Sequence, residues 1–151
     1  MRSRLPLSAI LFAILLASCG GHPDVTVKVG GETVRMVLAS ATERTGCSSQ
    51  HGDAFPQDVP LTTVRAAVPV TLQVEAGQGA TQIRGVVYDV DTPLASGGPS
   101  EDFTLPGRSG AHQLRSMVTA RTYSVLVNVQ WSALVKQGEV TYVFRVRIEP
   151  L

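Results

Sequence analysis

The sequence predicts an all-β fold: a single domain built as a two-sheet antiparallel sandwich of about seven strands. Three observations favour it. Valine and threonine supply 21 and 13 of the 133 residues from Cys19 onward, and both are β-branched types that suit a pleated sheet. Apolar and polar residues alternate with a period of two in the longest segments. Turns rich in Gly, Pro and Ser separate these segments, and none has a convincing helical period.

The first 23 residues lie outside this domain. Arg2 and Arg4 precede an apolar run from Leu5 to Leu16, which is the pattern of a secretory signal. The run is too short to span a bilayer core, which needs about 20 residues. The next residues, Leu16-Ala17-Ser18-Cys19, resemble the bacterial lipobox, in which the cysteine receives lipid and the signal is cut just before it. We therefore expect a lipoprotein signal peptide at 1–18, a lipidated Cys19 with a flexible tether at 19–23, and one β-sandwich domain at 24–151.

The N-terminal part of the domain predicts three strands. Segments 25–29 and 33–38 flank Gly30-Gly31, which is typical of a tight hairpin. Segment 70–75 alternates Val70, Leu72 and Val74 with polar residues, and Pro69 suits the first position of a strand or an edge.

Two further strands follow the turn at residues 76–79. In segment 81–90 Ile83 is out of phase with Val86, and Gly85 lies between them. We therefore expect a β-bulge at Gly85. A short strand is expected within 113–119.

The last two strands show the clearest alternation. Segment 123–131 places Tyr123, Val125, Val127, Val129 and Trp131 on one face, and segment 140–148 does the same for Val140, Tyr142, Phe144, Val146 and Ile148. These patterns predict an antiparallel hairpin joined by the polar connection 132–139. Its large side chains should form the structural core: Tyr123, Trp131, Tyr142 and Phe144.

Two features of this hairpin resemble known proteins. Tyr123, near the start of its strand, resembles the tyrosine corner of immunoglobulin-like and fibronectin type III domains, whose hydroxyl bonds backbone upstream. The series Tyr123, Trp131, Gly138, Tyr142 and Phe144 resembles the C-terminal hairpin of a group of uncharacterised bacterial lipoproteins. That resemblance implies an immunoglobulin-like sandwich, but it does not imply any particular activity.

One segment departs from that group. Its members have a Tyr-Cys-Trp-like segment, whereas this chain reads Thr45-Gly46-Cys47-Ser48-Ser49 and has no later cysteine. A disulfide-bearing role therefore does not carry over.

Charge excludes some partners. The chain has 13 Lys and Arg against 12 Asp and Glu, a net charge of +1, and loss of Arg2 and Arg4 with the signal would make it −1. Such a balance gives no basic surface for nucleic acid and no general attraction to anionic lipid. Membrane attachment would then rest on acyl chains. We expect the membrane as a partner through this anchor, no nucleic acid and no cofactor.

Two groups of side chains are candidates for a metal site. Cys47, His51 and Asp53 fall within seven residues of a Gly/Ser-rich loop. A thiolate and an imidazole there could bind a metal ion, the thiol could be a nucleophile with His51 as its base, or Cys47 could be a spectator.

The second group is acidic. Asp89 and Asp91 end one strand, and Glu101 and Asp102 follow the next loop. Calcium takes six to eight oxygen ligands, so four carboxylates fall short of a recognisable site, and solvated loop charges are the alternative.

Catalytic motifs are absent from the sequence. Ser109 lacks the strand–turn–helix context of a hydrolase nucleophile, and a phosphate loop, a dinucleotide fingerprint and a zinc-protease helix are missing. The sequence therefore predicts a protein that is not an enzyme but an exported lipoprotein, on the outer side of the cytoplasmic membrane or in the outer membrane or periplasm. Its sandwich would bind a protein or other envelope component. The alternative is a metal- or small-ligand-binding lipoprotein that uses Cys47 and His51 or the carboxylates.

Overall fold

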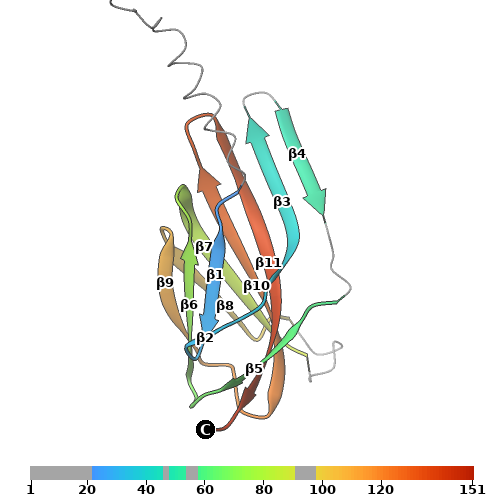
Figure 1. The fold of residues 1–151 in the computed structure, drawn as a ribbon, viewed down its shortest axis with the longest axis vertical. Coiled ribbons are helices and arrows are strands. Elements are labelled where there is room, and N and C mark those ends of the chain that lie inside the picture. Colours follow the sequence, from blue (N-terminus) through green and yellow to red (C-terminus); the bar gives the residue numbers. More distant parts are fainter. Residues whose placement is uncertain (1–21, 46–47, 54–57, 91–97) are drawn as a thin grey trace, which may run out of the picture.

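The structure, a computed structural model, describes residues 22–45, 48–53, 58–90 and 98–151, with only the backbone of 48–53. These residues form eleven strands in two layers (Figure 1). The strands are β1 (Val25–Val29), β2 (Glu32–Thr33), β3 (Val37–Thr45), β4 (Ser48–Asp53), β5 (Leu61–Arg65), β6 (Val70–Ala76), β7 (Ala80–Asp89), β8 (Glu101–Pro106), β9 (Ser109–Leu114), β10 (Arg121–Ser132) and β11 (Lys136–Glu149).

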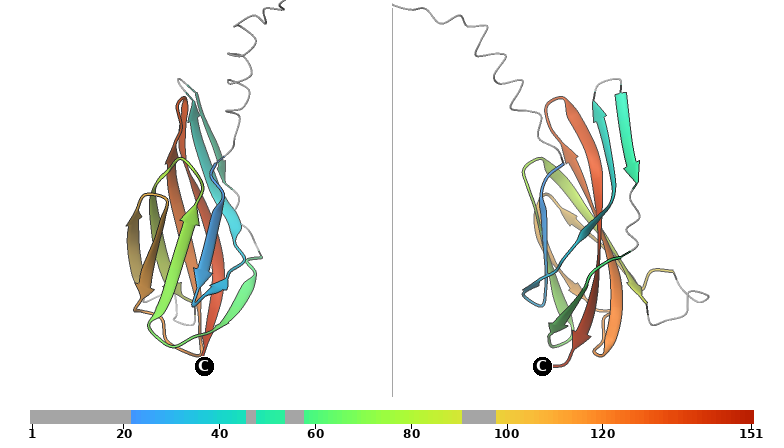
Figure 2. Two further views of the ribbon diagram at one scale, coloured as in Figure 1. Left: turned by 60° about the vertical axis from the view of Figure 1, so that its left-hand side comes forward. Right: turned by 45° about the vertical axis from the view of Figure 1, so that its right-hand side comes forward.

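The two layers are open sheets that pack face to face (Figure 2). The smaller sheet has the order β2-β1-β6-β9, and the larger has the order β4-β3-β11-β10-β7-β8 with β5 beside β11. Every pairing is antiparallel except that of β5 with β11. An all-β protein of two antiparallel sheets is therefore confirmed. The strands outnumber the expected seven because the expected segment 33–38 is divided between β2 and β3, and because β4, β5 and β8 were not expected.

The β10–β11 hairpin lies at the centre of the larger sheet. It pairs continuously from Arg121↔Ile148 to Ser132↔Gln137, and its inward residues are those that the alternation predicts. Tyr123 and Phe144 are 1% and 0% exposed. The inward face of the hairpin packs against the smaller sheet through Val27, Val29, Val70, Leu72, Val74, Leu114, Val125, Val127, Val129, Val140, Val146 and Ile148.

The turn of this hairpin is shorter than the expected connection 132–139. The Ala133 N–H bonds the Lys136 carbonyl at 2.7 Å, so strand pairing resumes at once and Gly138 lies within β11, opposite Trp131. A Cβ at Gly138 would lie 2.0 Å from the Thr42 carbonyl oxygen of β3 and 3.1 Å from Trp131 Cζ2. The absence of a side chain therefore lets β3 approach closely, and it also leaves room for the Trp131 indole.

The bulge expected at Gly85 is wrong. Ile83, Gly85 and Val87 all face inward without interruption, and the register shift between β7 and β10 lies at Gln130/Trp131 instead. A Cβ at Gly85 would lie 2.0 Å from Phe103 Cζ. The glycine thus sits where the Phe103 ring covers the strand, which explains why an apolar side chain is missing from that position of the pattern.

Two strands near the sheet crossings differ from the sequence-based bounds. Gly30 and Gly31 turn the first hairpin with φ of 57° and 88°. Its second strand stops at Thr33, because the chain crosses to the larger sheet and re-enters pairing at Val37. The strand expected within 113–119 is β9, which ends at Leu114, since the chain leaves the smaller sheet there.

The outer edge of β11 is shared by two partners. β3 pairs with residues 136–143, and β5 pairs in parallel with residues 145–149. Across the described residues, no helix is long and apolar enough to cross a bilayer.

Candidate functional site

The first group of predicted ligands is only partly described. Cys47, like Cys19 and Asp91, lies outside the described residues. His51 and Asp53 lie on β4, the edge strand of the larger sheet, rather than in the expected loop. The sequence of β4 is polar and short, so its pairing with β3 left no alternating pattern to detect.

The predicted acidic group is dispersed. Asp89 forms an ion pair with Arg121 at the start of β10. Glu101 and Asp102 occupy successive positions of β8, so Asp102 is exposed and Glu101 faces inward. Among the side chains that the structure describes, no group of three or more His, Cys, Asp and Glu is placed to hold a metal ion.

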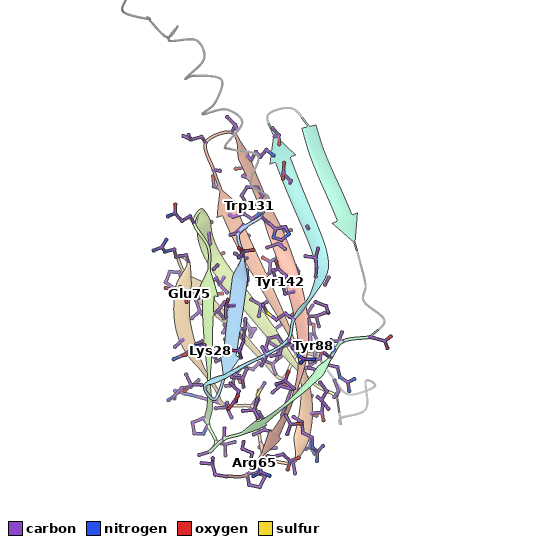
Figure 3. The ribbon with its side chains drawn as sticks, viewed as in Figure 1. Lys28, Arg65, Glu75, Tyr88, Trp131 and Tyr142 are labelled. Carbon is purple, nitrogen blue, oxygen red and sulfur yellow. The ribbon has the colours of Figure 1, made fainter. Side chains whose placement is uncertain are left out.

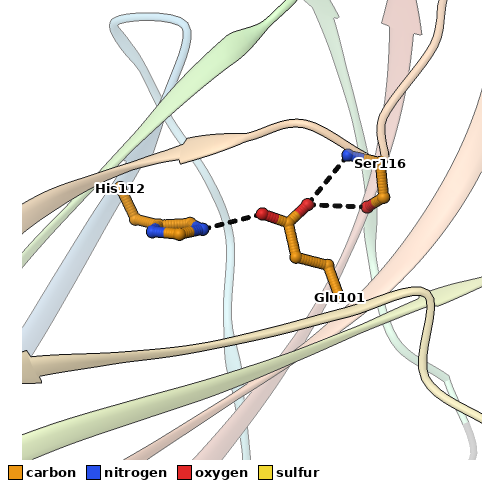
Figure 4. A network of polar contacts seen from close by, with 3 residues as sticks. All are labelled: Glu101, His112 and Ser116. Atoms are coloured by element: carbon orange, nitrogen blue, oxygen red, sulfur yellow. Dashed lines mark hydrogen bonds and ion pairs between the residues drawn. The ribbon is translucent and has the colours of Figure 1, made fainter.

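Glu101 instead forms the centre of a polar cluster with His112 and Ser116 (Figure 4). Its Oε1 lies 2.7 Å from His112 Nε2. Its Oε2 accepts the Ser116 backbone N–H at 2.9 Å and the Ser116 hydroxyl at 2.8 Å. The His112 ring stacks on Phe103, with centroids 4.8 Å apart. Because β8 and β9 are edge strands of different sheets, the cluster joins the two sheets along one open side.

The electrostatics of Glu101 favour its ionised form. Burial, which leaves 14% of its side chain exposed, acts to raise the pKa of this carboxyl. Hydrogen bonds from the Ser116 backbone, His112, the Ser116 hydroxyl and the Arg115 backbone lower it and outweigh burial, so the pKa of Glu101 lies below its ordinary value. A charged carboxylate therefore receives all the donors of the cluster.

The order of the three groups decides what the cluster can do. In a serine–histidine–acid catalytic arrangement the imidazole lies between the hydroxyl and the carboxylate and takes the hydroxyl proton. Here the carboxylate lies between, and the Ser116 hydroxyl donates to Glu101 rather than to His112. This geometry crosslinks strands and offers no imidazole base to the hydroxyl.

The sequence analysis placed Glu101 among loop carboxylates and assigned no role to His112 or Ser116. A signal was present in β8: Glu101, Phe103 and Leu105 alternate with exposed residues and so share the inward face. A carboxylate in phase with two buried apolar residues indicates a buried partner.

Tyr123 also anchors the connection between β9 and β10. Its hydroxyl accepts the backbone N–H of Val118 at 2.8 Å, which is the upstream backbone contact that the tyrosine-corner resemblance implies. Ser116 and Val118 flank Met117, which is 1% exposed. Two polar anchors and one apolar anchor thus fix the passage from β9 to β10.

The N-terminal end of the described chain packs on the sandwich. His22 Nδ1 lies 3.3 Å from the Tyr142 hydroxyl, Pro23 is buried, and the Gly77 N–H bonds the Asp24 carbonyl at 2.7 Å. Burial, followed by the charge of Asp24, raises the pKa of Tyr142. His22 and Pro23, which the sequence placed in the tether, therefore pack on the sandwich.

Comparison with known proteins adds no relative. No family model matches the chain, and no curated protein or solved structure matches it either. The chain is therefore an all-β protein of two packed sheets, and no family or homologue identifies it further.

Proposed function

We propose that the chain is an exported lipoprotein, anchored through Cys19, whose immunoglobulin-like sandwich is a non-catalytic binding module for another component of the cell envelope. The observation that carries this proposal is the start of the sequence. Two arginines, an apolar run and Leu16-Ala17-Ser18-Cys19 occur in the order of a lipoprotein signal.

The start of the packed domain supports an anchor at this cysteine. Because His22 already contacts Tyr142, only Gly20 and Gly21 separate Cys19 from the sandwich. An acylated Cys19 would hold the domain close to the bilayer surface. More than one acyl chain would be needed for stable attachment.

The non-catalytic part rests on the Glu101–His112–Ser116 cluster. This cluster brings a hydroxyl, an imidazole and a carboxylate together, and all three are used to join β8, β9 and the crossover. A binding role for the module needs no such chemistry.

The anchor is tested by growing cells with a radiolabelled fatty acid and comparing Cys19→Ala with the matched variant Cys47→Ala. We expect wild type and Cys47→Ala to carry the label and to sediment with membranes, whereas Cys19→Ala stays unlabelled as a longer precursor. A labelled, membrane-bound Cys19→Ala would overturn the proposal.

The binding role is tested by crosslinking the tagged protein in its native cell and identifying the products. A discrete crosslinked envelope component in wild type, lost in Cys19→Ala, is expected. If the wild-type protein gives no discrete product, the binding module is the wrong description.

A further inference from the structure

The turn of the β10–β11 hairpin is unusually apolar. Its residues Ala133, Leu134 and Val135, called the hairpin tip below, connect the two strands. Leu134 is 103% exposed and Val135 is 56% exposed. Hairpin turns are built mainly from Gly, Asn, Asp and Ser, so two large aliphatic side chains presented to solvent at a turn point to a surface that they contact.

The hairpin tip is held in a fixed shape. The Ser132 N–H bonds the Gly79 carbonyl at 2.8 Å, and the Ala133 N–H bonds the Lys136 carbonyl at 2.7 Å. Lys136 Nζ lies 2.8 Å from Glu43 Oε1, which ties the base of the tip to β3. The two apolar side chains are thus presented on a rigid projection.

This projection points in the direction from which the chain enters the sandwich. Figure 1 shows β1 beginning toward the end where β10 and β11 turn, with the C-terminus at the opposite end. His22 lies against Tyr142, and Figure 3 places Trp131 between Tyr142 and that end. From Tyr142 to Lys136 the strand covers six residues, which is about 20 Å at roughly 3.3 Å per residue.

The tether between Cys19 and the packed chain is short. Three residue steps separate Cys19 from His22, and they can span at most about 11 Å. The Asp24 carbonyl accepts from Gly77, and Gly79 of the same turn accepts from Ser132 at the base of the hairpin tip. The short tether therefore keeps a lipid-held Cys19 near the end of the sandwich from which the tip projects. Apolar side chains of interfacial proteins enter the headgroup and acyl boundary to a depth of about 5–10 Å.

We propose that the hairpin tip inserts into the lipid surface that holds Cys19, so that the protein contacts the bilayer at two points. This inference rests on the proposed lipid anchor. The exposed Arg44, opposite Gln137 in the neighbouring strand, lies beside the tip at the level of anionic headgroups. The second contact fixes the tilt of the sandwich and directs its opposite end, with Arg65 (Figure 3), away from the membrane.

The test places a single reactive cysteine in the full-length protein, produced in cells and purified with its lipid. Cys47→Ser removes the native thiol, and Leu134→Cys or Leu151→Cys carries an environment-sensitive fluorophore. Leu151 is the matched control because it is 88% exposed at the opposite end. Each protein is reconstituted in phosphatidylethanolamine and phosphatidylglycerol vesicles whose acyl chains carry bromine, which quenches only fluorophores at the acyl boundary.

The expected result is severalfold stronger quenching at position 134 than at position 151, together with fatty-acid labelling of both proteins. If both proteins are labelled and vesicle-bound but position 134 is quenched no more than position 151, the inserted tip is wrong and the anchor stands. If neither protein is labelled, the anchor fails and the tip inference fails with it.

Discussion

Glu101→Gln tests whether the carboxylate between the two sheets stabilises the fold. The amide keeps the shape of the side chain and can still accept from Ser116. It loses the negative charge and the charge-assisted contact at 2.7 Å from His112 Nε2. Hydrogen bonds to charged groups contribute about 1.5–3 kcal/mol each. We expect Glu101→Gln to lower the free energy of unfolding by about 2 kcal/mol, toward the low end because His112 is partly exposed.

Urea unfolding at pH 7, followed by circular dichroism, measures this loss. For a domain of this size it corresponds to a fall of roughly 6–8 °C in melting temperature. Asp102→Asn is the matched control, since its side chain is exposed on the other face of β8, and its effect should stay within about 0.5 kcal/mol.

The pH dependence has a definite sign. The folded protein lowers the pKa of Glu101 from its ordinary value of 4.5, so the stabilisation is complete above that value and is lost as the pH falls through the lower pKa of the folded state. The difference in free energy of unfolding between wild type and Glu101→Gln should therefore narrow as the pH falls below about 4.5. A difference of zero at pH 7, or one that does not narrow below about pH 4.5, would refute the reasoning.

Three further substitutions probe the packing by the same unfolding measurement. Phe144→Ala should cost about 3–5 kcal/mol because the ring is fully buried; an unchanged midpoint would contradict its inward position. Gly85→Ala should cost about 1–3 kcal/mol because its Cβ would lie 2.0 Å from the Phe103 ring, whereas Gly98→Ala, with open space around it, should be nearly neutral; equal effects would exclude the ring contact. Tyr123→Phe leaves a backbone N–H without its acceptor and should cost about 1–3 kcal/mol; a neutral result would mean that the hydroxyl does not anchor the crossover.

The inward and outward faces of the long strands could be predicted because the pattern that determines them lies within each strand. In β10 and β11 every second residue is large and apolar, so the period of two identifies the inward face without knowledge of the partner strand. Fold class followed from the same signal. β5 carries a single fully buried residue, Val64, and its parallel pairing depends on a strand about eighty residues later in the chain.

The polar cluster, like the pairing of β5, could not be predicted because it depends on contacts between different strands. Glu101, His112 and Ser116 are brought together only when β8 and β9 become facing edges of different sheets. The β-bulge was wrongly predicted at Gly85 because the side chain that covers this glycine, the Phe103 ring, comes from the neighbouring strand. Alternation predicts which face of a strand a side chain is on, but it does not predict which residues of other strands that side chain contacts.

The sharing of the β11 edge has a consequence for how separate copies of the chain meet. β10 and β11, with 12 and 14 residues, are the longest strands described, and both have neighbours on each side. The strands left at the open edges, β2, β4, β5, β8 and β9, have two to six residues. Exposed edges are templates for pairing with another chain, and short ones are poor templates. The order of the strands therefore opposes aggregation through edge pairing, because the longest strands, β10 and β11, lie in the interior of the larger sheet.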